Sequence, residues 1–186
     1  FYPVRNQKSA YFEEYKKKDN TDIANKLTQF RIDLVNKYIG ERGALVDIGL
    51  GSGKLIKERG RDTSGYDIDN SAWSWLCSRN RHIYASDQKE NASFFDSLEH
   101  IYFAESMVDT VRSICFVSMP VYTDRNGVLK SKHFKPNEHY WYFSPEGLAL
   151  WFFRRGFILL VVSDEETKMG REDILTFVFK RAQRSG

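Results

Sequence analysis

Three glycines stand at alternate positions directly after an apolar run, in the segment VDIGLGSGK. The run carries an acid, Asp47, and Gly49, Gly51 and Gly53 follow it. Such loops let the backbone approach a phosphate or a nucleotide closely, because glycine has no side chain in the way. A second acid, Asp67, lies in the later segment SGYDID. The acids and the loop together indicate a nucleotide-like ligand, and the glycine spacing narrows its chemistry.

The spacing excludes a P-loop and disfavours a dinucleotide site. A P-loop needs four residues between its first glycine and a Gly-Lys pair, and then a Ser or Thr for magnesium. Here only three residues intervene, and Leu55 follows Lys54. The dinucleotide fingerprint G-x-G-x-x-G has one more residue before its third glycine. The remaining pattern suits a ligand without a phosphate, with Asp67 on ribose hydroxyls and Asp47 near an ammonium group.

Apolar runs and helical periodicities place this loop at the end of a strand. The sequence predicts helices over residues 8–18, 22–39, 54–60, 70–80, 98–111 and 144–156. It predicts strands over 44–49, 63–69, 82–86, 92–96, 113–120, 157–166 and 172–181, with a long loop at 121–142 and a turn at 167–171. Strands that alternate with helices imply a parallel sheet whose ligands bind at the carboxyl ends of the strands.

The predicted fold class is therefore α/β. We expect a three-layer sandwich around a Rossmann-like, mainly parallel sheet, with N-terminal helices and an antiparallel C-terminal strand. We expect a single domain over 1–186, made of a helical segment (1–40), a cofactor-binding half (44–119) and a half with a substrate loop and a hairpin (120–186).

Composition narrows the class of protein further. The net charge of +3 and the pI of about 8.8 are too mildly basic for a dedicated nucleic-acid binder. Two separate cysteines, Cys77 and Cys115, disfavour a disulfide framework or a thiolate zinc cluster and favour a reducing, cytoplasmic location. No apolar run approaches the roughly 18 residues of a spanning helix, so we expect no membrane partner.

Three segments together resemble the class I S-adenosylmethionine-dependent methyltransferases. VDIGLGSG resembles the first motif of that family, and GYDID resembles its ribose-binding segment. FFDSLEHI is similar to the FDxLEH segment of members that act on small molecules, and HYWYFSPEGLALWFFRRGF is similar to a segment before their sixth strand. The resemblance implies methyl transfer from S-adenosylmethionine to a nucleophilic O, N or C atom of a small molecule, with S-adenosylhomocysteine as product.

The resemblance also implies roles for individual residues. Asp67 would hold the ribose, Ile68 would pack on the adenine, and Asp96 would lie beside the transferring methyl group. The full cofactor set is Asp47, Gly49, Leu50, Gly51, Ser52, Gly53, Asp67, Ile68, Asp87 and Asp96. The substrate set is Glu99, His139 and Tyr142, and the catalytic candidates are His100 and Tyr140. His100 is the candidate general base for a substrate hydroxyl near neutral pH.

The sequence departs from the family between its second and fourth strands. Asp96 follows Asp67 by only 29 positions. Because parallel strands need a crossover of a dozen or more residues, the third strand or the helix after it must be shortened. The acid that usually follows the third strand is then in question, and Asp87 is the candidate for it. A degenerate module that binds an adenosyl ligand without turnover is therefore an alternative function.

Two further alternatives stay open. A nucleic-acid methyltransferase is one, because the loop at 121–142 mixes basic and aromatic residues, although no Asn-Pro-Pro-Tyr segment follows the fourth strand. A divalent metal site is the other, formed by Asp96, Glu99 and His100 with His133 or His139. We expect no metal, because such LEH segments also occur in metal-free relatives. We expect a monomer or a homodimer.

Overall fold

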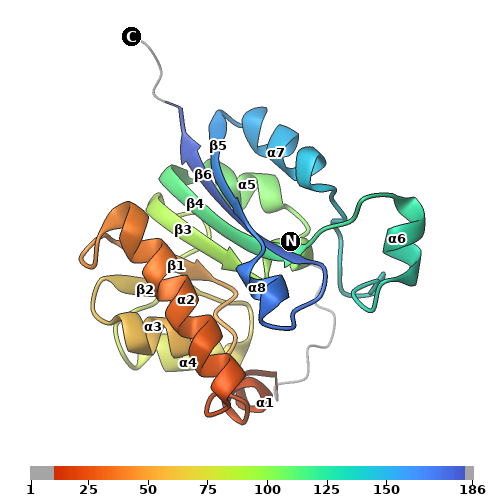
Figure 1. Ribbon diagram of the computed structural model, residues 1–186. Helices are drawn as coiled ribbons and strands as arrows, with labels where there is room; N and C mark the ends of the chain where they lie inside the picture. The colour runs from red at the N-terminus through yellow and green to blue at the C-terminus, as the bar shows by residue number, and fades with distance from the viewer. Residues whose placement is uncertain (1–10, 183–186) are drawn as a thin grey trace. The chain divides into compact units, whose positions relative to one another are not determined.

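The computed structural model describes residues 11–182 (Figure 1). Contacts divide the chain into two compact units, Phe1–Ser93 and Phe94–Gly186, and the boundary falls inside strand β3 (Lys89–Phe95). The first unit also contains α1 (Tyr11–Lys16), α2 (Asp22–Ile39), β1 (Leu45–Ile48), α3 (Lys54–Arg59), β2 (Thr63–Tyr66) and α4 (Asn70–Cys77). The first residues of the helix predicted over 8–18 lie outside the described residues. Among residues 11–182, no helix is both long and apolar enough to cross a membrane.

Strand β1 lies between two parallel partners in the first unit. It pairs with β2 from Leu45↔Thr63 to Ile48↔Tyr66, and with β3 at Asp47↔Ser93. The apolar sequence of β1 suits this position, because a central parallel strand is buried on both faces. The carboxyl ends of β1 and β2 therefore meet at one edge of the sheet, as the sequence analysis expected.

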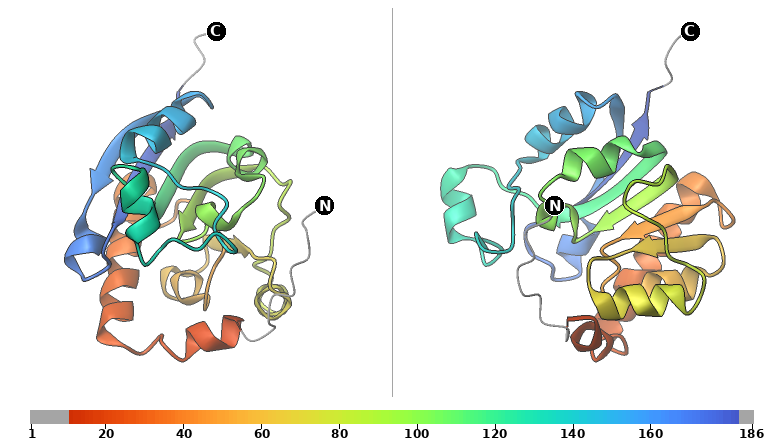
Figure 2. Two further views of the ribbon diagram at one scale, coloured as in Figure 1. Left: turned by 90° about the vertical axis from the view of Figure 1, so that its right-hand side faces the viewer. Right: turned by 180° about the vertical axis from the view of Figure 1, so that it is seen from behind.

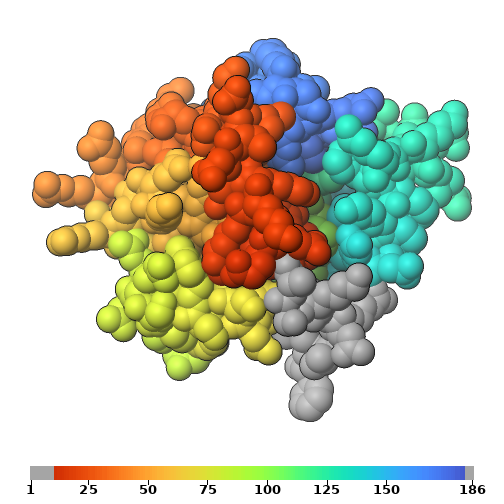
Figure 3. Space-filling view, turned by 90° about the horizontal axis from the view of Figure 1, so that it is seen from below, coloured from red at the N-terminus to blue at the C-terminus, as the bar shows by residue number. Residues whose placement is uncertain are grey.

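The helices of the first unit begin and end where local chemistry dictates. Thr21 caps α2 by accepting a hydrogen bond from the Ala24 N–H, and Gly40 ends the helix at a φ of 74°. Asp69 caps α4 in the same way. The apolar core of this unit joins α1, the glycine loop, α3 and α4, through Phe12, Leu50, Ile56, Ala72 and Leu76. The space-filling view shows α1 beside α4 (Figure 3).

The second unit begins with the end of β3 and contains an antiparallel strand pair. Its elements are η1 (Leu98–His100), α5 (Ala104–Asp109), β4 (Val111–Pro120), α6 (Arg125–Lys130), α7 (Pro145–Phe153), β5 (Phe157–Ser163), α8 (Glu165–Lys168) and β6 (Ile174–Arg181). Strand β6 pairs antiparallel with both β4 and β5. Helix α7 runs along β5 (Figure 2), and its Phe152 ring stacks on Phe179 of β6 at 3.9 Å.

The strand order β2-β1-β3-β4-β6-β5 confirms the predicted α/β class. The sheet is mixed, with two parallel pairs around β1 and two antiparallel pairs around β6. The predicted shortening is also confirmed. Residues 82–86 form no strand, and His82 makes only an isolated parallel bridge to Gly65. The prediction of a strand there was wrong because too few residues remain for a strand and a crossover before β3.

Three other boundaries differ from the predictions. The helix predicted over 98–111 is broken into η1 and α5, with a short connection between them. The predicted loop at 121–142 contains α6, whose N-cap is Asp124, and the predicted turn at 167–171 begins within α8. Both helices are single turns or little more, too short to show an apolar period in the sequence.

A buried charge network joins β4, α8 and β6 within the second unit. Glu166 of α8 is fully buried and accepts hydrogen bonds from Ser118 Oγ at 2.8 Å and Thr176 Oγ1 at 3.3 Å. The Arg171 guanidinium pairs with Glu166 and also with Asp96 Oδ1, the latter at 2.8 Å. One arginine therefore neutralises a buried carboxylate and holds the acid that ends β3.

We predict that Arg171→Met lowers the free energy of unfolding by about 3 kcal/mol, because it removes the guanidinium paired with a buried carboxylate. Lys132→Met is the matched control. Its ion pair with Glu172 lies between side chains that are 54% and 73% exposed, so we expect a change within about 0.5 kcal/mol. Chemical denaturation of both variants measures the difference. Equal losses would contradict the assigned role of Arg171.

Candidate functional site

The glycine loop after β1 adopts backbone conformations that other residues avoid. Gly49, Gly51 and Gly53 have φ angles of 74°, 58° and 79°, in the left-handed region where a Cβ is strained. Gly53 has a second constraint, because a Cβ there would lie 2.7 Å from the Trp75 ring. At Gly51 the nearest ring, that of Tyr15 in α1, would lie 3.6 Å from such a Cβ. The glycines therefore shape the loop, and Trp75 supports it from α4.

The other residues of the loop, and Lys54 after it, direct no charged side chain into the loop. Leu50 is buried in the core, and Ser52 Oγ accepts a hydrogen bond from the Lys54 N–H at 3.3 Å. The Lys54 ammonium donates to Asp19 O at 2.7 Å and to Asn25 Oδ1 at 2.8 Å. Lys54 thus anchors α3 to the start of α2, whereas a phosphate-binding loop would direct this lysine at its ligand.

Asp47 is a buried carboxylate at the end of β1. Its side chain is 4% exposed, and its Oδ1 accepts a hydrogen bond from Ser93 Oγ at 2.7 Å. The pKa of Asp47 is raised from 3.8 to about 6, chiefly by burial and to a smaller extent by the negative charge of Asp67, while Ser93 and Arg31 oppose the shift. The carboxylates of Asp47 and Asp67 therefore act on one another, and a cationic ligand group would relieve the cost of their charge.

Asp67 follows β2 and lies at the same edge of the sheet. Its Oδ1 accepts a hydrogen bond from the Asp69 N–H at 2.9 Å. Burial raises its pKa, and backbone hydrogen bonds from Asp69, Leu50 and Ile68 partly offset that. Ile68 is 52% exposed beside it, an apolar surface that suits contact with a flat ring. The structure brings together all the cofactor residues predicted between Asp47 and Ile68.

The shortened segment after α4 carries an aromatic cluster that the sequence analysis did not identify. The rings of Trp73, His82 and Tyr84 lie 5.1 to 6.0 Å apart between centroids. Asp87 Oδ2 accepts a hydrogen bond from the Tyr84 N–H at 2.8 Å, so this acid stabilises the turn that presents Tyr84. The aromatic residues are visible in the sequence segments WSW and HIY, but their closeness in space depends on the bridge between His82 and Gly65.

Asp96 of the predicted cofactor set lies in the second unit, with the predicted catalytic and substrate residues. Asp96 has a φ of 59°, and its carboxylate pairs with Arg171. Tyr140 is 37% exposed, and its ring lies edge-on to Tyr102 at 5.1 Å. Tyr142 is half-buried and lies 5.9 Å from the His139 ring. Of this set, the ion pair fixes Asp96 most directly, since Arg171 also holds Glu166.

Glu99, His100 and His139 converge in the same unit. Their ligating atoms all lie within 4.8 Å of one another, and the Tyr140 N–H donates to the Glu99 carbonyl at 2.7 Å. Burial lowers the pKa of His100, and burial together with the neighbouring His100 lowers that of His139 to about 4. Both imidazoles are therefore neutral near pH 7. His133, the alternative partner named above, does not join them, because its Nε2 contacts the Glu172 carbonyl at 3.0 Å.

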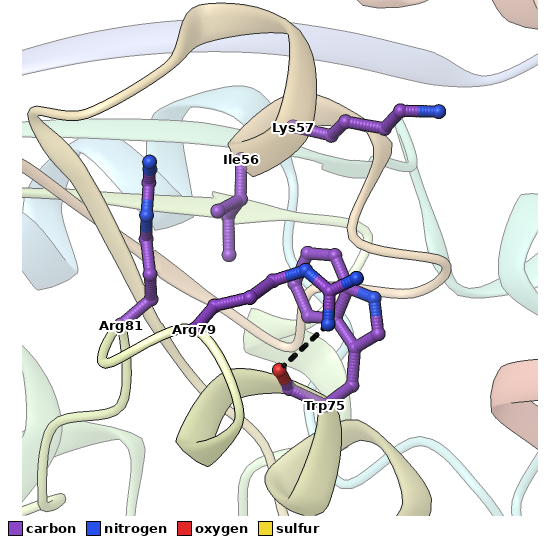
Figure 4. Close-up of a pocket in the computed structure, with 5 residues that line it drawn as sticks. All are labelled: Ile56, Lys57, Trp75, Arg79 and Arg81. Atoms are coloured by element: carbon purple, nitrogen blue, oxygen red, sulfur yellow. Dashed lines mark hydrogen bonds between the residues drawn. The ribbon is translucent and has the colours of Figure 1, made fainter.

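A separate cavity of about 300 Å³ lies between α3 and α4 (Figure 4). It is lined by Ile56, Lys57, Trp75, Arg79 and Arg81. The Arg79 guanidinium lies over the Trp75 ring at 4.4 Å and donates to the Trp75 carbonyl. None of the predicted cofactor residues lines this cavity. Trp75 connects the cavity to the glycine loop, because the same ring lies against Gly53.

Several solved structures with this fold are methyltransferases. A chain of the complex between the Haloferax volcanii Trm112 methyltransferase activator and its partner aligns with a TM-score of 0.69 and 11% identity, over 97% of this chain and 100% of that chain. The 1,6-didemethyltoxoflavin-N1-methyltransferase of Burkholderia thailandensis, with bound S-adenosylhomocysteine, gives 0.64 and 12%, over 94% and 85%. A SAM-dependent methyltransferase from Archaeoglobus fulgidus gives 0.60 and 15%, over 92% and 100%.

These likenesses show that the chain has the fold of the S-adenosylmethionine-dependent methyltransferases. No protein-family model matches the sequence, and no curated protein matches it significantly. At such low identity the fold is conserved without the sequence, so the function must be argued from the residues of the site.

We predict that Asp47→Asn stabilises the ligand-free protein at neutral pH by up to about 3 kcal/mol, the equivalent of its raised pKa. An acid whose folded pKa is raised contributes stability below its unfolded pKa and loses it as pH rises through the folded value, here from 3.8 to about 6. The wild type should therefore lose stability relative to Asp47→Asn over this range.

Denaturant titrations across this pH range measure the effect. The control is Asp62→Asn, which replaces an exposed acid before β2 and should leave the stability at neutral pH within about 0.5 kcal/mol of wild type. A less stable Asp47→Asn protein at neutral pH would show that the carboxylate is a structural requirement.

Proposed function

We propose that this protein transfers a methyl group from S-adenosylmethionine to a small-molecule acceptor. The observation that carries the proposal is the pair of acids, Asp47 and Asp67, at the ends of two adjacent parallel strands around a loop of left-handed glycines. Methyltransferases with the same fold, among them one that was crystallised with S-adenosylhomocysteine, support it.

The residues present fit this cofactor. The Asp67 carboxylate is oriented by backbone N–H groups, among them that of Asp69, and as an acceptor-only group it suits a ribose hydroxyl. Asp47 supplies negative charge for an ammonium group, directly or through water. The glycines allow close approach of the methionine part, and Lys54 is engaged with α2, as expected for a ligand without phosphates.

The cofactor, when bound, supplies a methyl group already activated on a sulfonium sulfur. The protein's task is then to orient the acceptor and to exclude water. For an acceptor hydroxyl, the oxygen forms the new bond to the methyl carbon, the carbon–sulfur electron pair stays on sulfur, and the hydroxyl proton must leave. We propose that Glu99, His100, His139, Tyr140 and Tyr142 form the acceptor side, with His100 as the candidate base. The neutral imidazole that its lowered pKa implies can accept that proton.

A degenerate module that binds an adenosyl ligand without turnover is the second candidate. The reduction of the third strand to one bridge, Gly65↔His82, favours it, because this segment would form the adenine side of the site. Asp87 is our candidate acid there, although its carboxylate is engaged with the Tyr84 backbone. Methyl transfer to nucleic acid is the remaining alternative, and the acceptor assay below includes it.

Calorimetric titration with S-adenosylmethionine, S-adenosylhomocysteine and NAD tests the proposal. We expect both adenosyl ligands to bind and NAD not to bind. Absence of adenosyl-ligand binding would contradict the proposal. Mass spectrometry then detects methylation of a metabolite extract, DNA or RNA. Binding of the adenosyl ligands without methylation of any of these would favour the degenerate module.

We predict that Asp67→Ala weakens the binding of S-adenosylhomocysteine by about tenfold or more, because a charge-assisted pair of hydrogen bonds is lost. Asp67→Asn keeps an acceptor for the Asp69 N–H and should weaken binding less. Asp62→Ala removes an equal charge just before the start of β2, at the end of the strand opposite Asp67. This variant should bind S-adenosylhomocysteine like wild type. Unchanged affinity in Asp67→Ala would rule out the assigned ribose contact.

A further inference from the structure

Two short segments of the second unit bring one carboxylate and two imidazoles to a single point. Glu99 and His100 come from η1, and His139 comes from the segment before α7. Their ligating atoms lie within 4.8 Å of one another. Glu99 and His139 are only 2% and 6% exposed. Three ligating side chains of the kinds that metals prefer, two of them buried, therefore converge on one point.

The backbone holds these segments in register. The Tyr140 N–H donates to the Glu99 carbonyl at 2.7 Å, which fixes the residue after His139 to the residue before His100. The two imidazole rings are nearly perpendicular, with centroids 4.5 Å apart and planes at 84°. The rings therefore meet edge to face and do not stack, and a ligating atom of each lies within 4.8 Å of the other and of Glu99.

The hydrogen bond of His100 selects its tautomer. Nδ1 lies 3.1 Å from the Glu138 carbonyl oxygen, which can only accept, so Nδ1 carries the proton. The lone pair is then on Nε2. A histidine that donates its other ring N–H to a backbone carbonyl is the usual outer-shell arrangement of a metal ligand.

We propose that Glu99, His100 and His139 bind one divalent first-row transition-metal ion, such as Zn²⁺, Mn²⁺ or Co²⁺. Two imidazole nitrogens and one carboxylate oxygen suit such ions, whereas Mg²⁺ and Ca²⁺ prefer oxygen ligands alone. Three protein ligands leave coordination positions open, as in sites where a metal also binds a substrate oxygen. The structure thus favours a metal where the sequence analysis expected none.

The neighbouring candidates belong to other interactions. Asp96 Oδ1 pairs with Arg171 at 2.8 Å, and His133 Nε2 contacts the Glu172 carbonyl at 3.0 Å. Neither residue belongs to the cluster of donors. The three-residue set is therefore defined by the geometry of the described residues, and His133 provides a matched control.

The binding of the ion does not depend on the proposed function, whereas the chemical role of the ion rests on it. The single lone pair of Nε2 either accepts a proton or binds a metal, so an ion would replace His100 as the group that activates an acceptor. An ion at this position would orient an acceptor oxygen and lower the pKa of its hydroxyl. The proton then passes to solvent, and the oxygen takes the methyl group as described above. This chemistry favours a hydroxyl acceptor over an amine.

The experiment uses the full chain, freed of any affinity tag and treated with a chelator. Calorimetric titration with Zn²⁺ and absorption spectra with Co²⁺ report binding without any need for turnover. We expect one equivalent to bind, with spectral bands that indicate nitrogen ligands. His139→Gln and Glu99→Gln should weaken binding by at least about tenfold, as losses around metal sites do. His133→Gln should bind like wild type.

The absence of saturable binding of both ions to the wild-type chain would overturn the proposal. Equal loss in His133→Gln and His139→Gln would also overturn it. Circular dichroism checks that each variant is folded, and if the buried variants unfold, His100→Gln and the wild-type Co²⁺ spectrum decide the outcome. A parallel titration with S-adenosylhomocysteine separates the two proposals. If the adenosyl ligand does not bind, a positive metal titration still stands, and if the metal does not bind, a positive adenosyl titration still stands.

Discussion

The hydrogen bond from Ser93 to Asp47 is the constraint on which the first unit depends. It joins β1 to β3 at paired residues and holds a carboxylate that is otherwise removed from water. The burial is unfavourable, as the raised pKa shows, and an apolar residue at this position would fit a buried strand better. A charge kept at such a cost, directly before the glycine loop, is typical of a site where function and stability conflict.

The second unit also contains a buried acid, but the charge of that acid is paired. Its fully buried acid, Glu166, is paired with Arg171 and two hydroxyl groups, so the charge is compensated within the fold. The Glu99 segment is organised otherwise, since η1 presents Glu99 and His100 toward a third donor from a distant segment. Glu166 is therefore a structural charge, whereas Glu99 belongs to the cluster that we propose as a metal site. The same arginine bridges Glu166 to Asp96, which explains how an acid after β3 can be held in a left-handed conformation.

Sequence reasoning succeeded where the determining chemistry is local. Helix α2 was predicted to the residue from its apolar periodicity and from Gly40 at its end, and Ser144 with Pro145 marks the start of α7. The meeting of Asp47 and Asp67 was predictable because the ends of parallel strands share an edge. Long-range pairings were not. The ion pair of Asp96 with Arg171 and the choice of His139 over His133 depend on how distant segments fold back, and a single sequence carries no signal for this.

The shortened segment after α4 does not disturb Asp67, the proposed ribose ligand. The ladder between β1 and β2 is complete from Leu45 to Ile48, and Asp67 follows it directly, so the position of Asp67 does not require a third strand. The short segment is also well anchored. Arg81 donates to the carbonyls of Gly60 and Thr63, and the buried Lys89 donates to those of Ala85 and Asp87. A segment with this many backbone ties is a compact replacement for the missing strand, and its His82 and Tyr84 rings pack with Trp73 of α4. The shortening therefore argues for an altered adenine side more than for a lost cofactor site.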